Sequence, residues 1–342
     1  MWNQVATLDL ENKVCMLSRT VAFTSLNRIV RKSRRLDRDL NDMRMILFSD
    51  HHRGKRDGSD DFVQCEKTYI AALNHYKNAQ FELTLLGDVD ELWENKVDEV
   101  GDDYDEVMQL ERHFYLKDKI HRIWGNHDDY WREPILFERY MGLYFKGLKI
   151  EEGIALNIHK KGKRIGEIAL VHGHQGSLGS DRFSTISRFF VRVFWRRWQN
   201  LIGQKLSSPT KNLRIRSKTD RVMYEWAAKR SGTVLICGHT HQPIFTSKSH
   251  LDQLEELNQQ GEMNADNADL LGVKKAEQTN VKVKGVRKPC YFNTGCCSFS
   301  DGDITGIEID QGRIQLVRWD AKTLGRTVLV ESSLEMVLQK CT

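Results

Sequence analysis

The histidines of this 342-residue chain are concentrated beside residues that can bind metal ions or move protons. Seven of the 12 histidines lie in short polar clusters with Asp, Asn or Gly, namely His51, His52, His127, His172, His174, His239 and His241. Neutral imidazole and carboxylate oxygen together suit Mn, Fe, Zn or Co. No cysteines stand in pairs at zinc-binding spacing, which argues against a closed structural zinc site. The sequence therefore predicts a metal centre built from histidine and carboxylate side chains.

Each polar cluster follows a short apolar run that predicts a buried β-strand. The clusters begin where the runs end, at residues 49–52, 87–88, 125–128, 172–174 and 238–241. Continuous apolar runs of this length are typical of strands that are covered on both faces. A helical pattern around Phe62, Tyr69 and Leu73 separates the first two runs, which indicates a β-α-β arrangement and an α/β fold. Because sites form at the carboxyl ends of such strands, we expect all five clusters to meet at one edge of a sheet.

The order of the clusters resembles that of the calcineurin-like dinuclear metallophosphoesterase superfamily. The family pattern reads D-x-H, GD, GNH[DE], H and GHxH. The matching residues here are Asp50-His51-His52, Gly87-Asp88, Gly125-Asn126-His127-Asp128, His172 and Gly238-His239-Thr240-His241. The resemblance covers residues 43–245 and the Asn-Thr-Gly segment at 293–295. It implies an α+β four-layer β-sandwich of mixed sheets flanked by helices.

The resemblance also implies two divalent metal ions, which can be Mn, Fe or Zn, with Mn favoured. The ligands of one ion would be Asp50, His52, Asp88 and His241. Those of the other would be Asp88, Asn126, His172 and His239, so that Asp88 bridges the pair. A hydroxide held between the two ions would attack phosphorus.

The remaining polar residues of the clusters receive supporting roles. The resemblance implies that His127 donates a hydrogen bond or a proton to the reacting phosphoester, and that Asp128 orients His127. His51 should point away from His52 in an extended strand end, so we expect it not to be a ligand. Two interpretations of His174 stay open. It either supports a metal ligand from behind or lies at the rim of the site.

Two local features favour a substrate with an apolar part. The segment Gly87-Asp88-Val89-Asp90-Glu91-Leu92-Trp93 resembles the GDxxExW block of UDP-2,3-diacylglucosamine pyrophosphohydrolases. An insertion follows His172, as in those enzymes, and here it extends over about 178–230. His127 departs from that family, which has Arg at this position, so a lipid-linked or UDP-sugar-lipid substrate is a hypothesis.

The insertion contains an amphipathic helical pattern at residues 183–203. Its apolar face is rich in aromatic residues, and on another face lies a ridge that we expect to bind substrate, formed by Arg188, Arg192 and Arg196. Three interpretations stay open: a cap packed on the domain, a lid or helix at the membrane surface, and a nucleic-acid contact. Residues 182–230 hold thirteen Lys and Arg but two acids, so this block should attract phosphate, lipid headgroups or nucleic acid.

Alternatives to a phosphoesterase acting on a small or lipid-linked substrate follow from the same features. The basic block favours a nuclease or nucleotide phosphodiesterase of the same fold. A fold that kept its metal ions and lost catalysis would be an interaction scaffold. Since every ligand position of the family pattern is filled, we expect an enzyme.

The rest of the chain predicts the organisation around this centre. We expect a basic helical N-terminal extension at 1–42, a domain at 43–342, a polar insertion at about 246–288, and a closing hairpin from strands at 304–309 and 313–319. With 40% hydrophobic residues the chain is not disordered, and it has no apolar stretch of transmembrane length. The lack of a signal peptide and an odd count of 7 cysteines favour reduced thiols in the cytoplasm. A lipid contact through residues 183–203 would bring the protein to the inner membrane surface.

Overall fold

A computed structural model describes residues 19–58, 60–95, 102–176, 213–249 and 288–342, which form two seven-stranded sheets. The strand order in the first sheet is β1 (Arg34–Asp39), β6 (Gly153–Lys160), β7 (Lys163–Val171), β8 (Thr233–Cys237), β11 (Tyr291–Asn293), β9 (Ile244–Phe245) and β10 (Lys248–Ser249). The order in the second sheet is β14 (Arg326–Ser333), β13 (Arg313–Trp319), β12 (Ile304–Asp310), β2 (Arg44–Phe48), β3 (Glu82–Leu86), β4 (Ile120–Ile123) and β5 (Ile150–Glu151). Both sheets contain parallel and antiparallel pairs.

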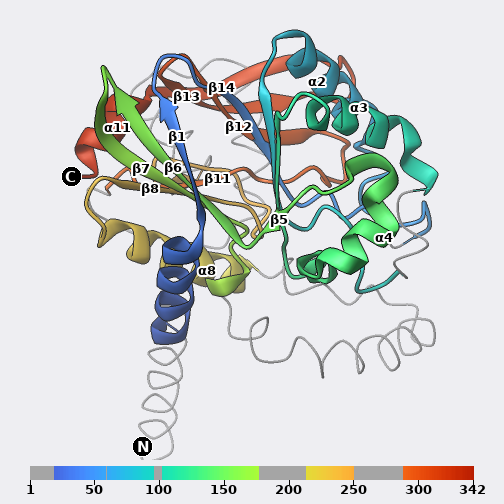
Figure 1. The fold of residues 1–342 in the computed structure, drawn as a ribbon, viewed down its shortest axis with the longest axis horizontal. Helices are drawn as coiled ribbons and strands as arrows, with labels where there is room; N and C mark the ends of the chain where they lie inside the picture. Colours follow the sequence, from blue (N-terminus) through green and yellow to red (C-terminus); the bar gives the residue numbers. More distant parts are fainter. Residues whose placement is uncertain (1–18, 59, 96–101, 177–212, 250–287) are drawn as a thin grey trace, which may run out of the picture.

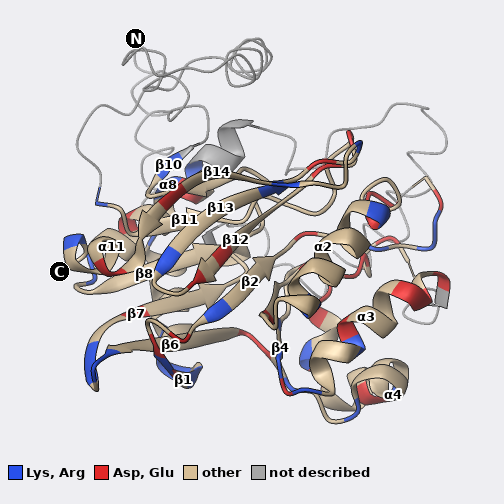
Figure 2. Cartoon of the chain, turned by 90° about the horizontal axis from the view of Figure 1, so that it is seen from above, with Lys and Arg blue, Asp and Glu red and all other residues tan. Residues whose placement is uncertain are grey.

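Helices cover the outer faces of the two sheets, and the sheets enclose one hydrophobic core between them (Figure 1). The second sheet carries α2 (Glu66–Asn78), α3 (Asp105–Tyr115) and α4 (Pro134–Phe145), which lie together on one side of the molecule (Figure 2). A helix at residues 19–32, α8 (Leu213–Ala228) and α11 (Leu334–Lys340) pack on the first sheet and add Leu26, Trp226 and Leu338 to its hydrophobic cluster. The predicted four-layer arrangement of mixed sheets flanked by helices is confirmed.

Strand β2 shows why the strands before the polar clusters read as continuous apolar runs. Met45 and Leu47 point into the core between the sheets, whereas Ile46 and Phe48 point into the core under the helices. Successive side chains of a strand alternate between its faces, and here both faces are buried. A central strand with both faces buried therefore favours an apolar sequence, although β4 buries His121 and Arg122 beside acidic partners.

The polar clusters do not all lie at the edge of one sheet, as the sequence led us to expect. The clusters after β2, β3 and β4 belong to the second sheet, and those after β7 and β8 belong to the first. A sequence pattern of alternating strands and helices does not show that the chain passes from the second sheet to the first between Glu151 and Gly153. The site therefore lies where the strand ends of two sheets meet.

The expectation of a helical extension up to residue 42 is wrong in its last part. Residues 34–39 form β1, an edge strand that pairs with β6 in parallel register. Its sequence RRLDRD carries no apolar alternation, because an edge strand can keep charged side chains that discourage pairing with other chains. The helix at residues 19–32 agrees with the prediction and buries Ile29 and Val30.

The C-terminal part contains the predicted hairpin and more. Strands β12 and β13 pair in antiparallel fashion from Ile304–Trp319 to Asp310–Arg313, which confirms the hairpin. The sequence did not predict β14, which pairs with β13, or α11, which packs on β7. The structure describes six free cysteines, all buried: Cys65, Cys237, Cys290, Cys296, Cys297 and Cys341.

Several predicted features lie outside the described residues. These are residues 1–18, the amphipathic segment at 183–203 with Arg188, Arg192 and Arg196, and residues 250–287 of the polar insertion. The described end of the 178–230 insertion is α8, whose Met223 and Trp226 belong to the domain core. The described start of the polar insertion forms β10, which pairs with β9.

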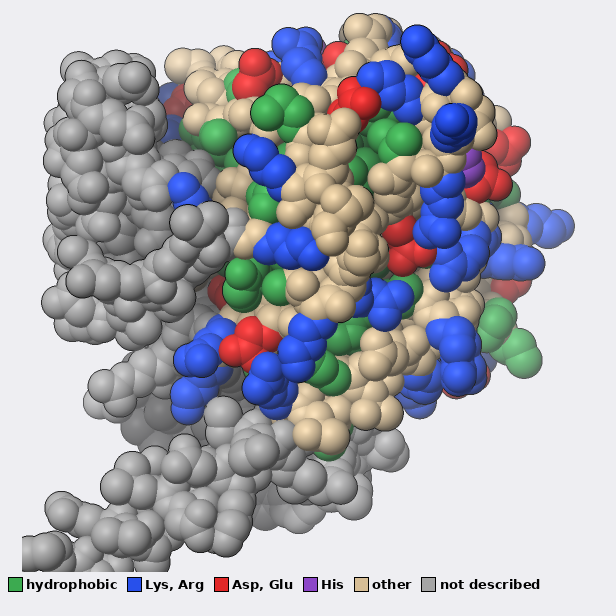
Figure 3. Space-filling model, turned by 90° about the vertical axis from the view of Figure 1, so that its left-hand side faces the viewer, with side chains coloured by type: hydrophobic (Ala, Val, Ile, Leu, Met, Phe, Trp, Pro, Cys, Tyr) green, Lys and Arg blue, Asp and Glu red, His purple; other side chains and the backbone are tan. Residues whose placement is uncertain are grey.

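Positive charge is prominent on one face of the molecule. On the side shown in Figure 3, Lys and Arg side chains outnumber Asp and Glu among the coloured atoms. Many of the arginines from the N-terminal segment have acidic partners, including Arg28 with Glu152 and Arg35 with Glu167.

Within the described ranges, no helix combines the length and the apolar character needed to cross a membrane.

Candidate metal centre

The ligand candidates stand on short loops that begin where a buried strand ends. Five of them have a left-handed backbone with positive φ: Asp50 at 53°, His52 at 52°, Asp88 at 50°, His239 at 70° and His241 at 56°. This region is costly for residues with a side chain, and Asn, Asp and His tolerate it better than most. Strained backbone of this kind is concentrated at functional sites, where the surrounding structure must hold it.

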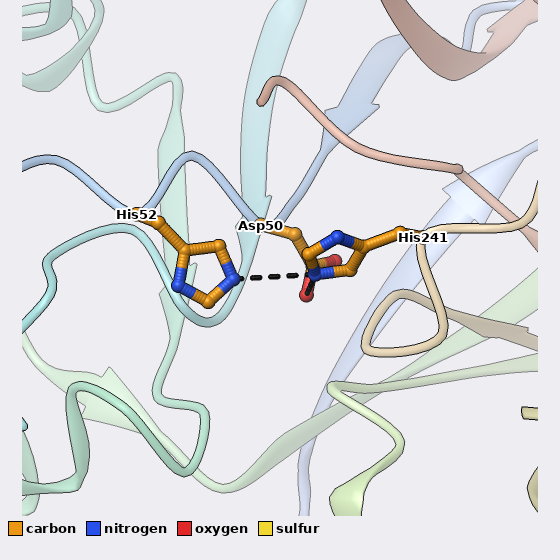
Figure 4. Close-up of side chains that lie close together, drawn as sticks. All are labelled: Asp50, His52 and His241. Carbon is orange, nitrogen blue, oxygen red and sulfur yellow. Dashed lines mark hydrogen bonds and ion pairs between the residues drawn. The ribbon is translucent and has the colours of Figure 1, made fainter. Parts of the chain in front are cut away.

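One group of candidate ligands joins the ends of β2 and β8. Donor atoms of Asp50, His52 and His241 all lie within 4.8 Å of one another. Figure 4 shows the two imidazoles facing each other, with 3.2 Å between the Nε2 atoms of His52 and His241. His241 Nε2 is also 3.3 Å from Asp50 Oδ1. The group therefore combines residues from both sheets.

A second group joins the ends of β3, β7 and β8. Donor atoms of Asp88, His172 and His239 lie within 4.8 Å of one another, and His172 Nε2 is 3.0 Å from Asp88 Oδ2. His172 Nδ1 lies 2.8 Å from the carbonyl oxygen of Leu86, so this nitrogen donates and Nε2 is directed at the carboxylate. Burial would lower the pKa of His172, but the facing Asp88 carboxylate raises it to about 9.

Asn126 completes the set of seven predicted ligands. It is buried in the loop after β4, and its Oδ1 atom has no hydrogen-bond partner among the described residues. The backbone nitrogen of the next residue, His127, donates to Asp88 Oδ1 over 2.8 Å, which brings this loop to the bridging candidate Asp88. The structure thus brings six of the predicted ligands together and places the seventh, Asn126, in a loop that bonds to Asp88.

The chemistry of the donor set fits divalent cations. Two buried atoms, Asn126 Oδ1 and His239 Nδ1, find no hydrogen-bond partner within the described part of the chain, and Asp50 Oδ1 and His172 Nε2 face only other candidate ligands. Buried polar atoms without partners are costly, and a cation between them removes that cost. Asp50 and Asp88 have pKa values held below the ordinary range despite burial, mainly by neighbouring histidines, so both offer ionised oxygens.

His127 is positioned by Glu91 rather than by Asp128. Its Nδ1 atom lies 2.6 Å from Glu91 Oε2, and the same oxygen lies 2.9 Å from Nδ1 of the candidate ligand His52. Trp93 stacks on the His127 ring with centroids 4.1 Å apart. Burial would raise the pKa of Glu91, but the two histidines lower it to about 2. Glu91 and Trp93 both belong to the GDxxExW block identified from the sequence. The motif alone did not show that these two residues would hold His127.

Asp128 instead holds the backbone of two ligand loops. Its carboxylate accepts hydrogen bonds from the backbone nitrogens of Gly125 at 2.6 Å, Val89 at 3.0 Å and Asp88 at 3.3 Å. The resemblance implied that Asp128 orients His127. In the structure the Asp128 side chain points instead toward the loop after β3. Burial raises the pKa of Asp128 to about 6, against the lowering effect of Arg122.

The other two histidines of the clusters do not join a ligand group. His51 lies in the core under α2, with its ring 4.6 Å from that of Tyr69 and 5.6 Å from that of Phe62. It therefore points away from His52, as expected for consecutive residues, whose side chains point to opposite sides. His174 is buried behind the second group, 5.5 Å from the His172 ring and 5.4 Å from the Trp124 ring, which favours the supporting position over the rim.

The fold and the clustered ligands define a protein of the metallophosphoesterase class. Residues 43–243 match the sequence profile of the calcineurin-like phosphoesterase family, and this chain belongs to that family. Its members typically bind two divalent metal ions, for which the two ligand groups described above are the candidates, and a further combination of His52, Asp88 and His127 lies between them. A search among curated proteins finds no match.

Solved structures show only a weak likeness to this chain. A predicted phosphoesterase from Streptococcus pneumoniae TIGR4 is 13% identical, with a TM-score of 0.30 over 82% of this chain and 90% of that one. Vacuolar protein sorting 29 from Cryptosporidium parvum is 13% identical, with a TM-score of 0.33 over 85% and 98%. A Vps29 variant from Entamoeba histolytica is 13% identical, with 0.33 over 85% and 99%. The family assignment therefore depends on the sequence profile.

Proposed function

We propose that this protein hydrolyses a phosphomonoester or a pyrophosphate bond with the help of two divalent metal ions. The observation that carries the proposal is the convergence of six candidate metal-ligand side chains next to His127, a residue able to donate a proton. Family membership supports metal-dependent phosphoester chemistry in general. The bond that is cleaved and the substrate are our proposal.

Each ion would be held by residues from both sheets. The ligands of one would be Asp50, His52, Asp88 and His241, and those of the other Asp88, Asn126, His172 and His239. When bound, such ions polarise a phosphoryl oxygen and make a bound water a stronger nucleophile near neutral pH. Mn²⁺ is the ion that we favour, because imidazole, amide and carboxylate ligands all suit it.

His127 is the residue placed to supply a proton. Glu91 accepts a hydrogen bond from Nδ1, which leaves Nε2 to donate to a phosphate oxygen or to the departing group. Burial would lower the pKa of His127, but Glu91 and Asp88 raise it above its ordinary value, which favours the protonated ring that a proton donor needs. The stacked Trp93 ring limits rotation of the imidazole.

We further propose that the group attached to phosphorus is partly apolar, as in a lipid-linked or UDP-sugar-lipid substrate. Two half-buried tryptophans support this, since Trp93 stacks on His127 and Trp124 lies beside His174. Indole surfaces next to a polar centre suit an apolar or aromatic group. With such a substrate we propose that the protein acts in the cytoplasm at the inner membrane surface, through residues 183–203.

The test is hydrolysis by purified, Mn²⁺-loaded protein of UDP-diacylglucosamine, soluble nucleotides and an aryl phosphate. We expect turnover of the acylated substrate at a higher kcat/KM than that of the soluble ones. Hydrolysis of nucleotides alone, with no gain from acyl chains, contradicts the lipid substrate. Absence of hydrolysis with stoichiometric metal bound contradicts the enzyme itself.

The expected substrate contacts of the arginine ridge need a separate comparison. The variant Arg188→Gln/Arg192→Gln/Arg196→Gln should raise KM for the acylated substrate and leave kcat on the aryl phosphate unchanged. Arg221→Gln is the matched control, because it removes an arginine of the same basic block that is exposed on α8 and bonds to Glu225. Equal effects of both changes would contradict a substrate-binding role for the ridge.

A further inference from the structure

A buried ionic network lies directly behind the metal ligands. We use this name for Arg53, Asp90, Glu111 and Arg122, whose side chains are each no more than 1% exposed. Arg53 Nε donates to Asp90 Oδ1 over 3.1 Å, and its NH1 group donates to Glu111 Oε1 over 3.0 Å. Arg122 donates to the other oxygen of Asp90. Asp90 therefore joins Arg53, which follows β2, to Arg122, which lies in β4.

The ionic network is connected to the ligands through the backbone. Arg53 follows the ligand His52, and Asp90 stands two residues after the ligand Asp88. The backbone nitrogen of Arg53 donates to the carbonyl oxygen of Val89 over 3.0 Å, and that of Glu91 donates to Arg53 over 2.8 Å. The two ligand loops thus continue side by side beyond the ends of β2 and β3.

Arg122 extends the connection to the third ligand loop. It lies in β4 before Asn126, and its NH2 group is 3.6 Å from Oδ2 of Asp128, the residue whose carboxylate binds the backbone of the loops after β3 and β4. Trp131 Nε1 donates to Asp90 over 2.8 Å, and Tyr69 donates to Glu111 over 3.1 Å. Loops from three strands therefore share one set of buried charges.

Stability alone does not explain why these charges are buried. Removing charges from water is costly, and replacing a buried ionic cluster by uncharged side chains of similar size is often neutral or stabilising. The loops that the ionic network joins contain Asp50, His52 and Asp88, all with positive φ. Such a backbone persists only where its surroundings hold it in place.

We propose that the ionic network holds the loops at 50–53 and 88–91 in the ligand-binding conformation before metal arrives, with Asp90 as the central positioning residue. The network thereby strengthens metal affinity without touching the ions. This inference rests on the metal centre of the proposed function. Residues that orient metal ligands from behind commonly change metal affinity by about 10- to 100-fold when they are replaced.

The test separates metal affinity from stability. The charge-free variant Arg53→Met/Asp90→Asn/Glu111→Gln/Arg122→Met removes all four charges and keeps oxygen acceptors for Trp131 and Tyr69. We expect its urea unfolding midpoint in metal-free buffer to stay near that of the wild-type protein. Its dissociation constant for Mn²⁺ in equilibrium dialysis should rise by about 10- to 100-fold. The electron paramagnetic resonance signal of a coupled Mn²⁺ pair should weaken at equal Mn²⁺ concentration.

Controls make each outcome decisive. Arg56→Met breaks the more exposed pair with Glu66, outside the ionic network, and should leave Mn²⁺ affinity unchanged. If the charge-free variant binds Mn²⁺ as tightly as the wild-type protein, or if Arg56→Met weakens binding equally, the inference is overturned. If the charge-free variant does not fold, Asp90→Asn alone decides, because unchanged Mn²⁺ affinity overturns the inference and weaker affinity supports it. A wild-type protein that binds no Mn²⁺ would instead overturn the proposed function.

Discussion

At the scale of single residues, the candidate metal ligands and the candidate proton donor are different side chains. Donor atoms of Asp88 lie within 4.8 Å of those of His172 and His239 and also of that of His52, so Asp88 connects the two ligand groups. His127 is held by Glu91 and Trp93. A nitrogen of its ring also lies within 4.8 Å of donor atoms of His52 and Asp88, and the expected role of His127 is to donate a proton to the substrate. Replacing the two residues should therefore have different effects.

We predict that His127→Ala lowers kcat by about 10²- to 10⁴-fold, the usual contribution of a positioned proton donor. Its Mn²⁺ content should equal that of the wild-type protein, because the ligands remain. Asp88→Asn should lose both activity and Mn²⁺, since an amide offers one oxygen where a bridging carboxylate offers two. Steady-state kinetics and elemental analysis measure these effects. Wild-type rates in both variants would show that the site is wrong.

Gly125 is required by the close approach of two ligand loops. A Cβ atom at this position would overlap the Asp88 carboxylate and lie 2.6 Å from the Asp88 backbone nitrogen. We predict that Gly125→Ala displaces Asp88 and reduces bound Mn²⁺, measured by equilibrium dialysis. Gly58→Ala is the matched control, because a Cβ atom there meets nothing within 4 Å. Normal Mn²⁺ content in Gly125→Ala would contradict the described loop packing.

At the scale of elements, strand β1 ties the two sheets together by charge. It pairs with β6 of the first sheet, and its arginines reach acids of the second: Arg34 bonds to Glu151 over 2.9 Å and Arg38 to Glu82 over 2.8 Å. Glu82 also lies 3.1 Å from His121 of β4. The basic end of the N-terminal segment is therefore used for internal pairing.

The Glu82 contacts predict a pH-dependent contribution to stability. Burial would raise the pKa of Glu82, but His121 and Arg38 lower it below the ordinary value of 4.5. A carboxyl group whose pKa is lowered by folding stabilises the folded state above its unfolded pKa, and this contribution is lost as the pH falls through the folded pKa. Glu82→Gln should therefore lower the free energy of unfolding at pH 7 and have less effect as the pH falls below about 4.5.

Urea unfolding of wild-type and Glu82→Gln protein at several pH values measures this difference. Asp42→Asn is the control, because Asp42 is exposed in the turn before β2 and its change should have little effect at any pH. A Glu82→Gln effect that is equally large in acid would mean that packing, rather than the charge, links β1 to the second sheet.

At the scale of the whole molecule, the metal centre joins the two halves of the sandwich. Asp50, His52, Asp88 and Asn126 come from the second sheet, whereas His172, His239 and His241 follow strands of the first. Ions bound there would connect the sheets in the folded state only. Binding to the folded state alone stabilises it by mass action.

We therefore predict that free Mn²⁺ at 100 times its dissociation constant raises the free energy of unfolding by about 2.7 kcal/mol for each site. Chelation should reverse the effect. Urea unfolding with and without Mn²⁺ measures it, and Asp88→Asn should show little Mn²⁺ dependence. Equal unfolding midpoints of the wild-type protein under both conditions would contradict a folded-state metal centre.

Much of the site could be predicted because it consists of local signals. Each cluster is contiguous in sequence and follows an apolar strand such as 45–48, whose side chains fill two cores. The role of Asp128 could not be predicted, because a carboxylate beside His127 in sequence turns to backbone nitrogens of another loop. Strand β1 was missed because an edge strand with paired arginines has no hydrophobic pattern.

The sequence by itself determined the ligand types, their order and the strands that present them, because metal chemistry and two-sided burial each restrict the residue type at a position. Only the tertiary structure decided that the clusters come from two sheets, that Glu91 serves both His52 and His127, and that Asp90 joins Arg53 to Arg122. These contacts link residues distant along the chain, and their geometry depends on how the packed sheets bring the loops together.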